Sequence, residues 1–130
     1  MTESPAGPPQ WRWPADGKVV EGFVAGDPDH KGLKIAGHEG QEVRAAAPGK
    51  IVYSGSGLIG YGRLIIIKHN NNFLSAYGHN RKIIVKEGDQ VKGGQLIAEM
   101  GNPRGGSPML HFEIRRDGKP VNPAALLPRR

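Results

Sequence analysis

The chain has no cysteine among its 130 residues, so disulfide bonds and thiolate zinc sites are excluded. No apolar run approaches the roughly 20 residues that a membrane-spanning helix needs. The first ten residues are rich in proline, glycine and polar residues and lack the apolar stretch of a signal peptide. We therefore expect a linker left by truncation at residues 1–12 and one folded domain at residues 13–130.

Aromatic residues are also scarce, at 6% of the chain, although the formal net charge is +6. A basic chain favours an anionic partner, such as an acidic polymer or an acidic protein surface. Nucleic-acid modules usually combine a basic stripe with interleaved aromatic residues. The scattered basic residues of this chain do not follow that pattern, so we do not expect a nucleic-acid partner.

Glycine and proline are abundant instead, with 20 glycines and 11 prolines that divide the chain into short segments. The segments between them are rich in Ile, Val and Tyr, as β-strands are, and no window of useful length shows a helical period. The sequence therefore predicts an all-β domain, an antiparallel sandwich or barrel-like fold. The expected strands are Lys18–Phe23, Leu33–Ala36, Glu42–Ala46, Lys50–Ser54, Arg63–His69, Phe73–Tyr77, Lys82–Lys86, Gln95–Met100 and Met109–Arg116.

Three local patterns refine this prediction. In the last expected strand, Leu110, Phe112 and Ile114 should face the core, and the polar residues between them should face the other way. The run of asparagines at residues 70–72 predicts a hairpin turn, because asparagine tolerates positive φ. A short echo between residues 39–44 and 87–92 suggests a duplicated β motif.

Two motifs have the form of metal-binding motifs with one residue replaced in each. Residues 30–34 have the form His-x-Gly-x-Asp with Lys34 in place of the aspartate, and residues 109–111 have the form His-x-His with Met109 first. A catalytic zinc usually takes three protein ligands and a water. Lysine has an ordinary pKa near 10.4, so neutralising it at pH 7 costs about 4–5 kcal/mol. Methionine cannot transfer a proton, so acid–base catalysis also loses a partner.

The five histidines have different expected roles. His38 lies in a glycine-flanked turn and should be solvated, and His69 ends a strand and should bond to the backbone. His30, His79 and His111 form a set only if the fold brings them together, which their spacing cannot show.

The motifs together resemble the LytM-type (lysostaphin-like) metallopeptidase domain, from Trp13 to the end of the chain. The matching blocks are Trp13–Val19, His30–Gly37, Ala45–Val52, Gly60–His69, Ser75–Asn80, Val91–Gln95 and Leu110–Arg115. Residues 60–70, 74–80, 110–115 and 121–128 are most similar to the NlpD-type murein hydrolase activators within that family.

This resemblance implies an all-β fold with a central groove. It matches His30 and His111 to zinc ligands and His79 to a catalytic histidine, whereas Lys34 and Met109 depart from the peptidase pattern. It therefore implies no catalytic residue, no bound metal and no cofactor. The residues expected to border the groove are His30, Lys34, Tyr61, Tyr77, His79, Met109, His111 and Arg115.

The resemblance also implies a partner. Activators of this kind engage a cell-wall N-acetylmuramoyl-L-alanine amidase and displace a regulatory helix from its zinc site, which promotes hydrolysis of septal peptidoglycan. The native protein would then be periplasmic, often anchored to the outer membrane by lipid, with a glycan-binding module ahead of this domain. Peptidoglycan itself is a further expected contact.

Two alternatives remain open from the sequence. One is a working zinc endopeptidase that cuts peptidoglycan cross-links with an altered ligand set. The other is a peptidoglycan-binding module that uses the same groove without an amidase partner.

Overall fold

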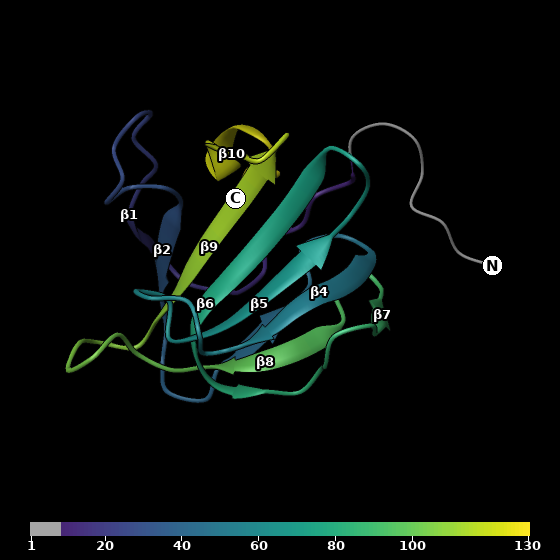
Figure 1. The fold of residues 1–130 in the computed structure, drawn as a ribbon. Helices are drawn as coiled ribbons and strands as arrows, with labels where there is room; N and C mark the ends of the chain where they lie inside the picture. The colour runs from purple at the N-terminus through teal and green to yellow at the C-terminus, as the bar shows by residue number, and fades with distance from the viewer. Residues whose placement is uncertain (1–8) are drawn as a thin grey trace.

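The computed structural model describes residues 9–130, which form ten β-strands and one short 3₁₀ turn (Figure 1). The elements are β1 (Val19–Glu21), β2 (Leu33–Ala36), β3 (Glu42–Arg44), β4 (Gly49–Gly55), β5 (Arg63–Lys68), β6 (Phe73–Ile83), β7 (Gln90–Val91), β8 (Leu96–Met100), β9 (Met109–Arg116), β10 (Lys119–Val121) and η1 (Pro123–Ala125). No helix within residues 9–130 has the length and apolar character that crossing a membrane requires.

The strands pair antiparallel in the order β1-β2-β9-β6-β5-β4-β7. β10 adds to β9, and β8 links β3 to the far end of β6. Figure 1 shows β9, β6, β5 and β4 side by side in the main sheet. The predicted all-β antiparallel fold is confirmed, and the sheet is open rather than closed into a barrel.

β6 is the longest strand and connects the two parts of the fold. Its first part, residues 73–78, pairs with β9, and its last part, residues 80–83, pairs with β8. His79 lies between the two parts with φ +66°, a left-handed conformation that is uncommon outside glycine. The register to β5 shifts at the same place, so β6 changes direction there as strands do at a bulge. The structure therefore has one strand where the sequence predicts two strands with a break after Tyr77.

One hydrophobic cluster fills the space between these parts. Ile65 and Ile67 from β5, Phe112 from β9 and Ile97 from β8 are at most 1% exposed. Fully burying side chains of this kind contributes about 1.5–3 kcal/mol each. Leu110 and Ile114 are buried beside Phe112, so the predicted inward face of the last strand is confirmed.

Residues 70–72 form the predicted hairpin turn, but without the positive φ that the prediction assumed. The Asn70 side-chain oxygen accepts hydrogen bonds from the backbone nitrogens of Asn72 and Phe73, both at 2.8 Å. Among the described residues other than glycine, positive φ occurs only at His79 and Asp117. The turn therefore depends on side-chain bonding to the backbone, which is another common role of asparagine.

The two echo segments share a local geometry. Gly40 and Gly88 both have positive φ, and each precedes a short strand, β3 and β7 respectively. These strands pair with different partners, β8 and β4.

The packed domain begins before the predicted boundary at residue 13. Trp11 packs edge-on against His69 and Phe73, with ring centroids 4.9 and 5.7 Å apart, and the Arg12 backbone nitrogen donates to the Ala46 carbonyl. Residues 11 and 12 are therefore part of the fold rather than of a linker. Residues 1–8 of the predicted linker at residues 1–12 lie outside the described residues.

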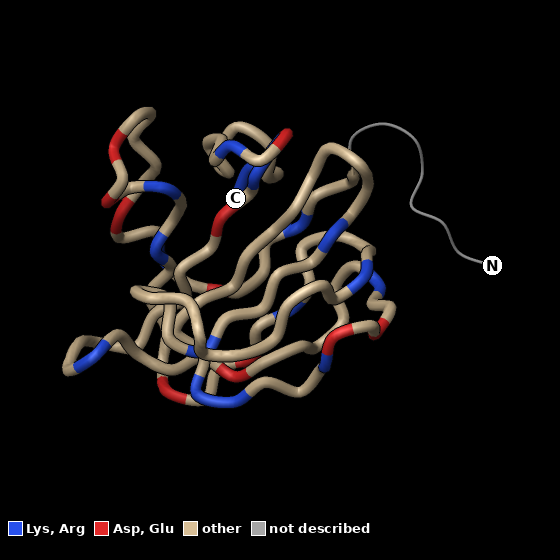
Figure 2. The backbone as a smooth tube through the Cα atoms, in the orientation of Figure 1, with Lys and Arg blue, Asp and Glu red and all other residues tan. Residues whose placement is uncertain are grey.

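Basic residues do not gather in one stripe. Figure 2 shows Lys and Arg distributed over several elements around the molecule, interspersed with Asp and Glu. The basic stripe that nucleic-acid binding usually uses is not seen in the described part of the chain.

His69 is buried at the end of β5 and is bonded as predicted. Its Nδ1 lies 2.7 Å from the Pro48 carbonyl oxygen, and its Nε2 lies 2.7 Å from the Ser75 hydroxyl. Burial disfavours the charged ring and lowers the pKa of His69 to about 4, although the hydrogen bond to the Pro48 carbonyl acts in the opposite direction.

This pKa predicts that the domain loses stability in mild acid. Below pH 6.5 the unfolded chain takes up a proton at residue 69 that the folded chain excludes until about pH 4. The contribution of His69 is therefore complete above pH 6.5 and falls as the pH drops, by roughly 2 kcal/mol at pH 5. Urea unfolding of wild type and His69→Gln, measured above pH 6.5 and at pH 5, should show a smaller pH dependence of the free energy of unfolding in the variant. His38→Gln is the control, because His38 is exposed. An unchanged pH dependence in His69→Gln would contradict the assignment.

Candidate functional site

Strand register brings the motif residues to the face of the sheet opposite the core. Lys34 on β2 is paired with His111 on β9, and His111 is paired with Gly78 on β6. Because alternate residues share a face, Glu113 and Arg115 follow His111 on this outer face. The predicted outward orientation of these polar side chains is confirmed.

The loop between β4 and β5 crosses over this face and is held there by Tyr61. The Tyr61 carbonyl accepts a hydrogen bond of 2.7 Å from the His79 backbone nitrogen, and its ring packs 5.5 Å from that of His111. A Cβ atom at Gly78 would lie 3.2 Å from the Tyr61 carbonyl oxygen. Glycine at residue 78 thus allows the loop to lie close to β6.

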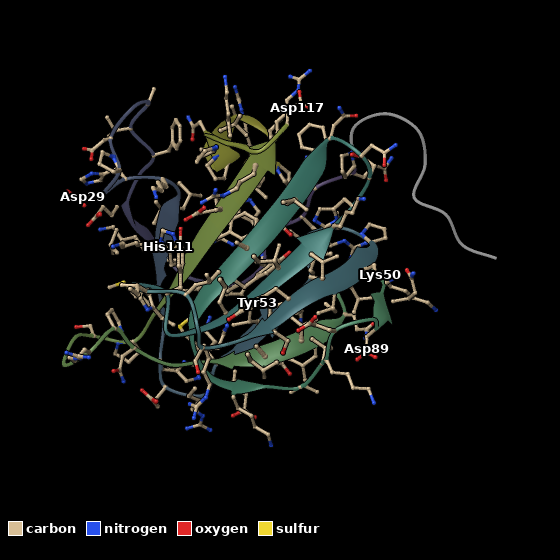
Figure 3. The ribbon with its side chains drawn as sticks, in the orientation of Figure 1. Asp29, Lys50, Tyr53, Asp89, His111 and Asp117 are labelled. Atoms are coloured by element: carbon tan, nitrogen blue, oxygen red, sulfur yellow. The ribbon has the colours of Figure 1, made fainter. Side chains whose placement is uncertain are left out.

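A pocket of about 240 Å³ lies between this loop and the segment that precedes β2. We call it the His111 pocket. It is lined by Pro28, Asp29, Lys31, Lys34, Ile59, Gly60, Tyr61, His79, His111 and Glu113. Figure 3 shows His111 on the side of the sheet nearest the loop that carries Asp29. A larger hollow of about 510 Å³, between residues 13–17 and 36–44, contains none of these residues.

Glu113 is the hub of a hydrogen-bonded network below the pocket. The side chain is fully buried, and one carboxylate oxygen accepts from the Tyr61 hydroxyl at 2.8 Å and lies 2.7 Å from Nε2 of His111. The other oxygen accepts two bonds from the Arg115 guanidinium, at 2.7 and 2.9 Å. The Arg115 guanidinium also donates to the Tyr61 hydroxyl at 3.3 Å.

Glu113 remains ionised because its partners outweigh its burial. Burial alone would raise its pKa, but hydrogen bonds from His111, Arg115 and Tyr61 and the charge of Arg115 lower the pKa of Glu113 to about 2. The pKa of Tyr61 is raised, first by burial and then by its bond to Glu113, so the phenol stays protonated and donates. The network fixes the ring of Tyr61 between His111 and Arg115.

His79 is neutral at the edge of the pocket. Its pKa is lowered to about 4, first by burial and then by repulsion from His111 and Lys34. Its ring centroid lies 6.1 Å from that of His111, so the fold does bring these two histidines together.

His30 is held by acids instead of facing the pocket freely. Its Nδ1 lies 2.9 Å from an Asp27 carboxylate oxygen and its Nε2 lies 3.3 Å from a Glu21 carboxylate oxygen. The Lys34 ammonium lies 3.7 Å from the same Glu21 oxygen. Both ring nitrogens of His30 are thus engaged, beside a cation.

These residues do not suit a zinc ion. Zinc needs deprotonated donors with free lone pairs, whereas this site offers an ammonium at residue 34 and a histidine with both nitrogens engaged. No group of three or more His, Cys, Asp or Glu side chains in residues 9–130 has the arrangement of a metal site. The chemistry of the donors therefore gives this pocket no metal-dependent step.

The predicted groove residues divide into three groups. Lys34, Tyr61, His79 and His111 line the His111 pocket, and Arg115 lines an adjoining pocket next to Tyr61. His30 lies beside Lys34, and Met109 lies on the same face as His111, paired with Ala36.

The prediction for Tyr77 was wrong. Tyr77 is fully buried, and its hydroxyl is bonded to the Ala46 backbone nitrogen and to Ser75. Tyr77 alternates with the outward residues of β6 and therefore faces the core.

Glu113 is the main residue that the sequence prediction of the site left out. Alternation in the last strand had placed it on the same face as His111, but its burial and its bonds to Tyr61 depend on a loop 52 positions earlier in the chain. Lys31, Ile59 and Gly60 were also left out, because they come from loops whose path the strand pattern does not determine.

A sequence model of Peptidase family M23 matches residues 28–123, and the chain belongs to that family. It is 57% identical to the lipoprotein NlpD/LppB homolog of Pseudomonas aeruginosa and 54% identical to the murein hydrolase activator NlpD of Escherichia coli K12, each over 92% of this chain. These matches cover 40% and 32% of the two relatives, so the chain spans well under half of their length. Among solved structures, a zinc-containing peptidase from Vibrio cholerae is similar with a TM-score of 0.79 and 31% identity, over 93% of this chain and 41% of that one. The two relatives are thus named for a lipoprotein and for an activator, whereas the structural neighbour is named for a zinc peptidase.

Removing the charge of Glu113 should destabilise the domain. Glu113→Gln replaces one acceptor oxygen with a donor that faces other donors, so we expect a loss of roughly 1–3 kcal/mol in the free energy of unfolding at pH 7. The difference should shrink below pH 4.5 and vanish near pH 2, because the stability that the carboxylate contributes is lost as it takes up its proton. Urea unfolding measures both effects. Glu99→Gln is the control, because its bond to Arg81 is more exposed and should be worth about 1 kcal/mol or less. Equal losses in the two variants would mean that the network does not support the fold.

Restoring a carboxylate at residue 34 should improve zinc binding. Wild type should take up no stoichiometric zinc in a calorimetric titration. Lys34→Asp places an oxygen donor beside His111 on the neighbouring strand and removes a cation, so its zinc affinity should rise at least roughly tenfold, a gain of about 1.4 kcal/mol. Lys31→Asp makes the same charge change elsewhere in the pocket and should give a smaller gain. One tightly held zinc in wild type, or no gain in Lys34→Asp, would contradict this account.

Proposed function

We propose that this domain is a non-catalytic activator of cell-wall N-acetylmuramoyl-L-alanine amidases. The observation that carries the proposal is the Lys34 ammonium in the His111 pocket. Lys34 of β2 is paired there with His111 of β9. Lys34 stands where the family's peptidases have a zinc ligand, and Met109 stands where they have a catalytic histidine. The pocket therefore suits binding rather than hydrolysis.

The partner segment is the regulatory helix that covers the amidase's own zinc site. Capture of that helix by the activator would uncover the site and promote hydrolysis of septal peptidoglycan. Tyr61 and Arg115 are suited to this role, because both are partly exposed and are held in place by Glu113. Preorganised aromatic and arginine side chains are typical anchors of protein interfaces.

The relatives' names support the proposal and its location. The name of the Escherichia coli relative describes an activator of murein hydrolases, and the name of the Pseudomonas aeruginosa relative marks a lipoprotein homolog. We place the full-length protein in the periplasm, anchored to the outer membrane, where it would also contact peptidoglycan. A peptidase role with an altered ligand set is disfavoured by the engaged nitrogens of His30 and by the absence of a proton carrier at Met109.

The proposal predicts that Tyr61→Ala and Arg115→Ala abolish stimulation of a cognate amidase. Truncating such anchors typically costs about 1–4 kcal/mol of binding free energy. The assay is dye release from labelled sacculi by purified amidase, with and without each variant, and a thermal melt of each variant shows that it is folded. Val52→Ala is the control, because Val52 is an exposed residue of β4 that lines neither the His111 pocket nor the adjoining pocket at Arg115.

The outcomes separate the candidate functions. Stimulation by both variants at the level of wild type would mean that this face is not the activating surface. Binding of wild type to sacculi without stimulation of any amidase would favour a peptidoglycan-binding module. Chelator-sensitive release of peptides by the domain alone would favour a peptidase.

A further inference from the structure

A second, apolar pocket adjoins the His111 pocket on the outer face of the sheet. It has a volume of about 160 Å³, and its apolar wall comes from Leu58, Leu64, Ile66, Leu74 and Ala76. Leu58 is 44% exposed, and Ile66 and Leu74 are half-buried, although none of the three belongs to the core cluster. We call it the Ile66 pocket.

Tyr61 and Glu113 line both pockets, so the two hollows are neighbours separated by one aromatic ring. Strand register gives the same arrangement. One row across the strands contains Ile66, Ala76 and Glu113. The row that contains Lys34 and His111 lies two residues away along β9. The outer face therefore has a polar corner, which is the His111 pocket near β2, and an apolar corner, which is the Ile66 pocket near β5.

The polar corner retains hydrogen-bond donors for an acidic group. An ammonium has three donors, and the ion pair of Lys34 with Glu21 is long, at 3.7 Å. Lys31 lines the same pocket. Of the acids there, Glu113 is fully buried and its charge is matched by Arg115, so it does not offset Lys34 as an exposed carboxylate would. Asp29, at the rim, is the remaining acid that lines the pocket.

We infer that the two pockets form one bipartite docking surface for an amphipathic helix, with a carboxylate of the helix at Lys34 and an apolar side chain in the Ile66 pocket. This inference rests on the proposed function and specifies the segment that the domain captures. Complementary charge and shape at the two ends would set the direction of the helix across the sheet.

The register also gives the spacing of the two helix residues. The polar corner is separated from the apolar wall by two to three strand spacings of about 4.8 Å and by one step of about 6.7 Å along the strand. The direct separation is then roughly 12–16 Å, which corresponds to about 8–11 residues of a helix. Residues separated by about 7, 8 or 11 positions lie on the same face of a helix, so one helix can reach both pockets.

The test measures binding of a fluorescent synthetic peptide, the regulatory helix of the amidase that wild type stimulates, by anisotropy. Leu58→Ser and Ile66→Thr should each weaken binding at least tenfold without changing its dependence on salt. Lys34→Glu should weaken binding to a similar extent and flatten the salt dependence, because an ion pair is lost. Ile84→Ser is the matched control, since Ile84 is 47% exposed and belongs to neither pocket, and it should bind as wild type does.

Exchanging the charges of the peptide and of residue 34 separates a lost ion pair from a loss of folding, because only a folded variant can regain binding. A peptide with its acidic residues changed to lysine should bind wild type weakly and Lys34→Glu at least tenfold better. Normal amidase stimulation and peptide binding by Leu58→Ser and Ile66→Thr would overturn the bipartite surface and leave the proposed function standing. Failure of the charge exchange to restore binding would overturn the placement of the carboxylate at Lys34. If wild type stimulates no amidase, the proposed function is itself wrong, and this assignment of the partner is wrong with it.

Discussion

The buried carboxylate of Glu113 is the interaction on which the rest of the site depends. A fully buried acid is costly unless it is paired and hydrogen-bonded, and here the bonds come from Tyr61, His111 and Arg115. These partners belong to two different parts of the chain, the β4–β5 loop and strand β9. Satisfying the charge therefore positions the loop over the sheet, and the loop in turn forms one wall of both pockets.

The character of the site follows from the Lys34 ammonium in the His111 pocket. Lys34 of β2 places a cation in the His111 pocket, in register with His111 of β9. The neighbouring histidines are occupied otherwise, since His30 is bonded to Asp27 and Glu21, and His79 is kept neutral by burial and by the nearby charges. The donors of this pocket thus suit a metal ion poorly, and this is the basis of the acidic ligand that we propose.

Much of the fold was predictable from the sequence, because strand alternation and glycine punctuation act locally. Alternation predicted the inward face of β9, the asparagines predicted the hairpin at residues 70–72, and the strand end predicted the backbone bond of His69. The continuity of β6 was not, because a histidine with positive φ in mid-strand is stabilised by tertiary contacts with the Tyr61 loop. Backbone strain of this kind is often located at functional sites.

The site itself was predictable only in part. Two motifs identified Lys34 and His111, the family resemblance added His79, and the fold does bring the three together. Tyr77 was wrongly expected at the groove, because its motif does not say which face of β6 it occupies, and its hydroxyl is bonded in the core. Glu113 and the apolar wall at Ile66 and Leu74 were missed, because they acquire a role only when β5, β6 and β9 lie side by side.

The central claim is that the domain acts by removing an inhibitory helix from an amidase and does no chemistry itself. The most direct measurement compares dye release from labelled sacculi by an intact amidase and by the same amidase lacking its regulatory helix, each with and without this domain. The account predicts strong stimulation of the intact enzyme, and a truncated enzyme that is already active and gains nothing. Equal stimulation of both enzymes, or of neither, would contradict it.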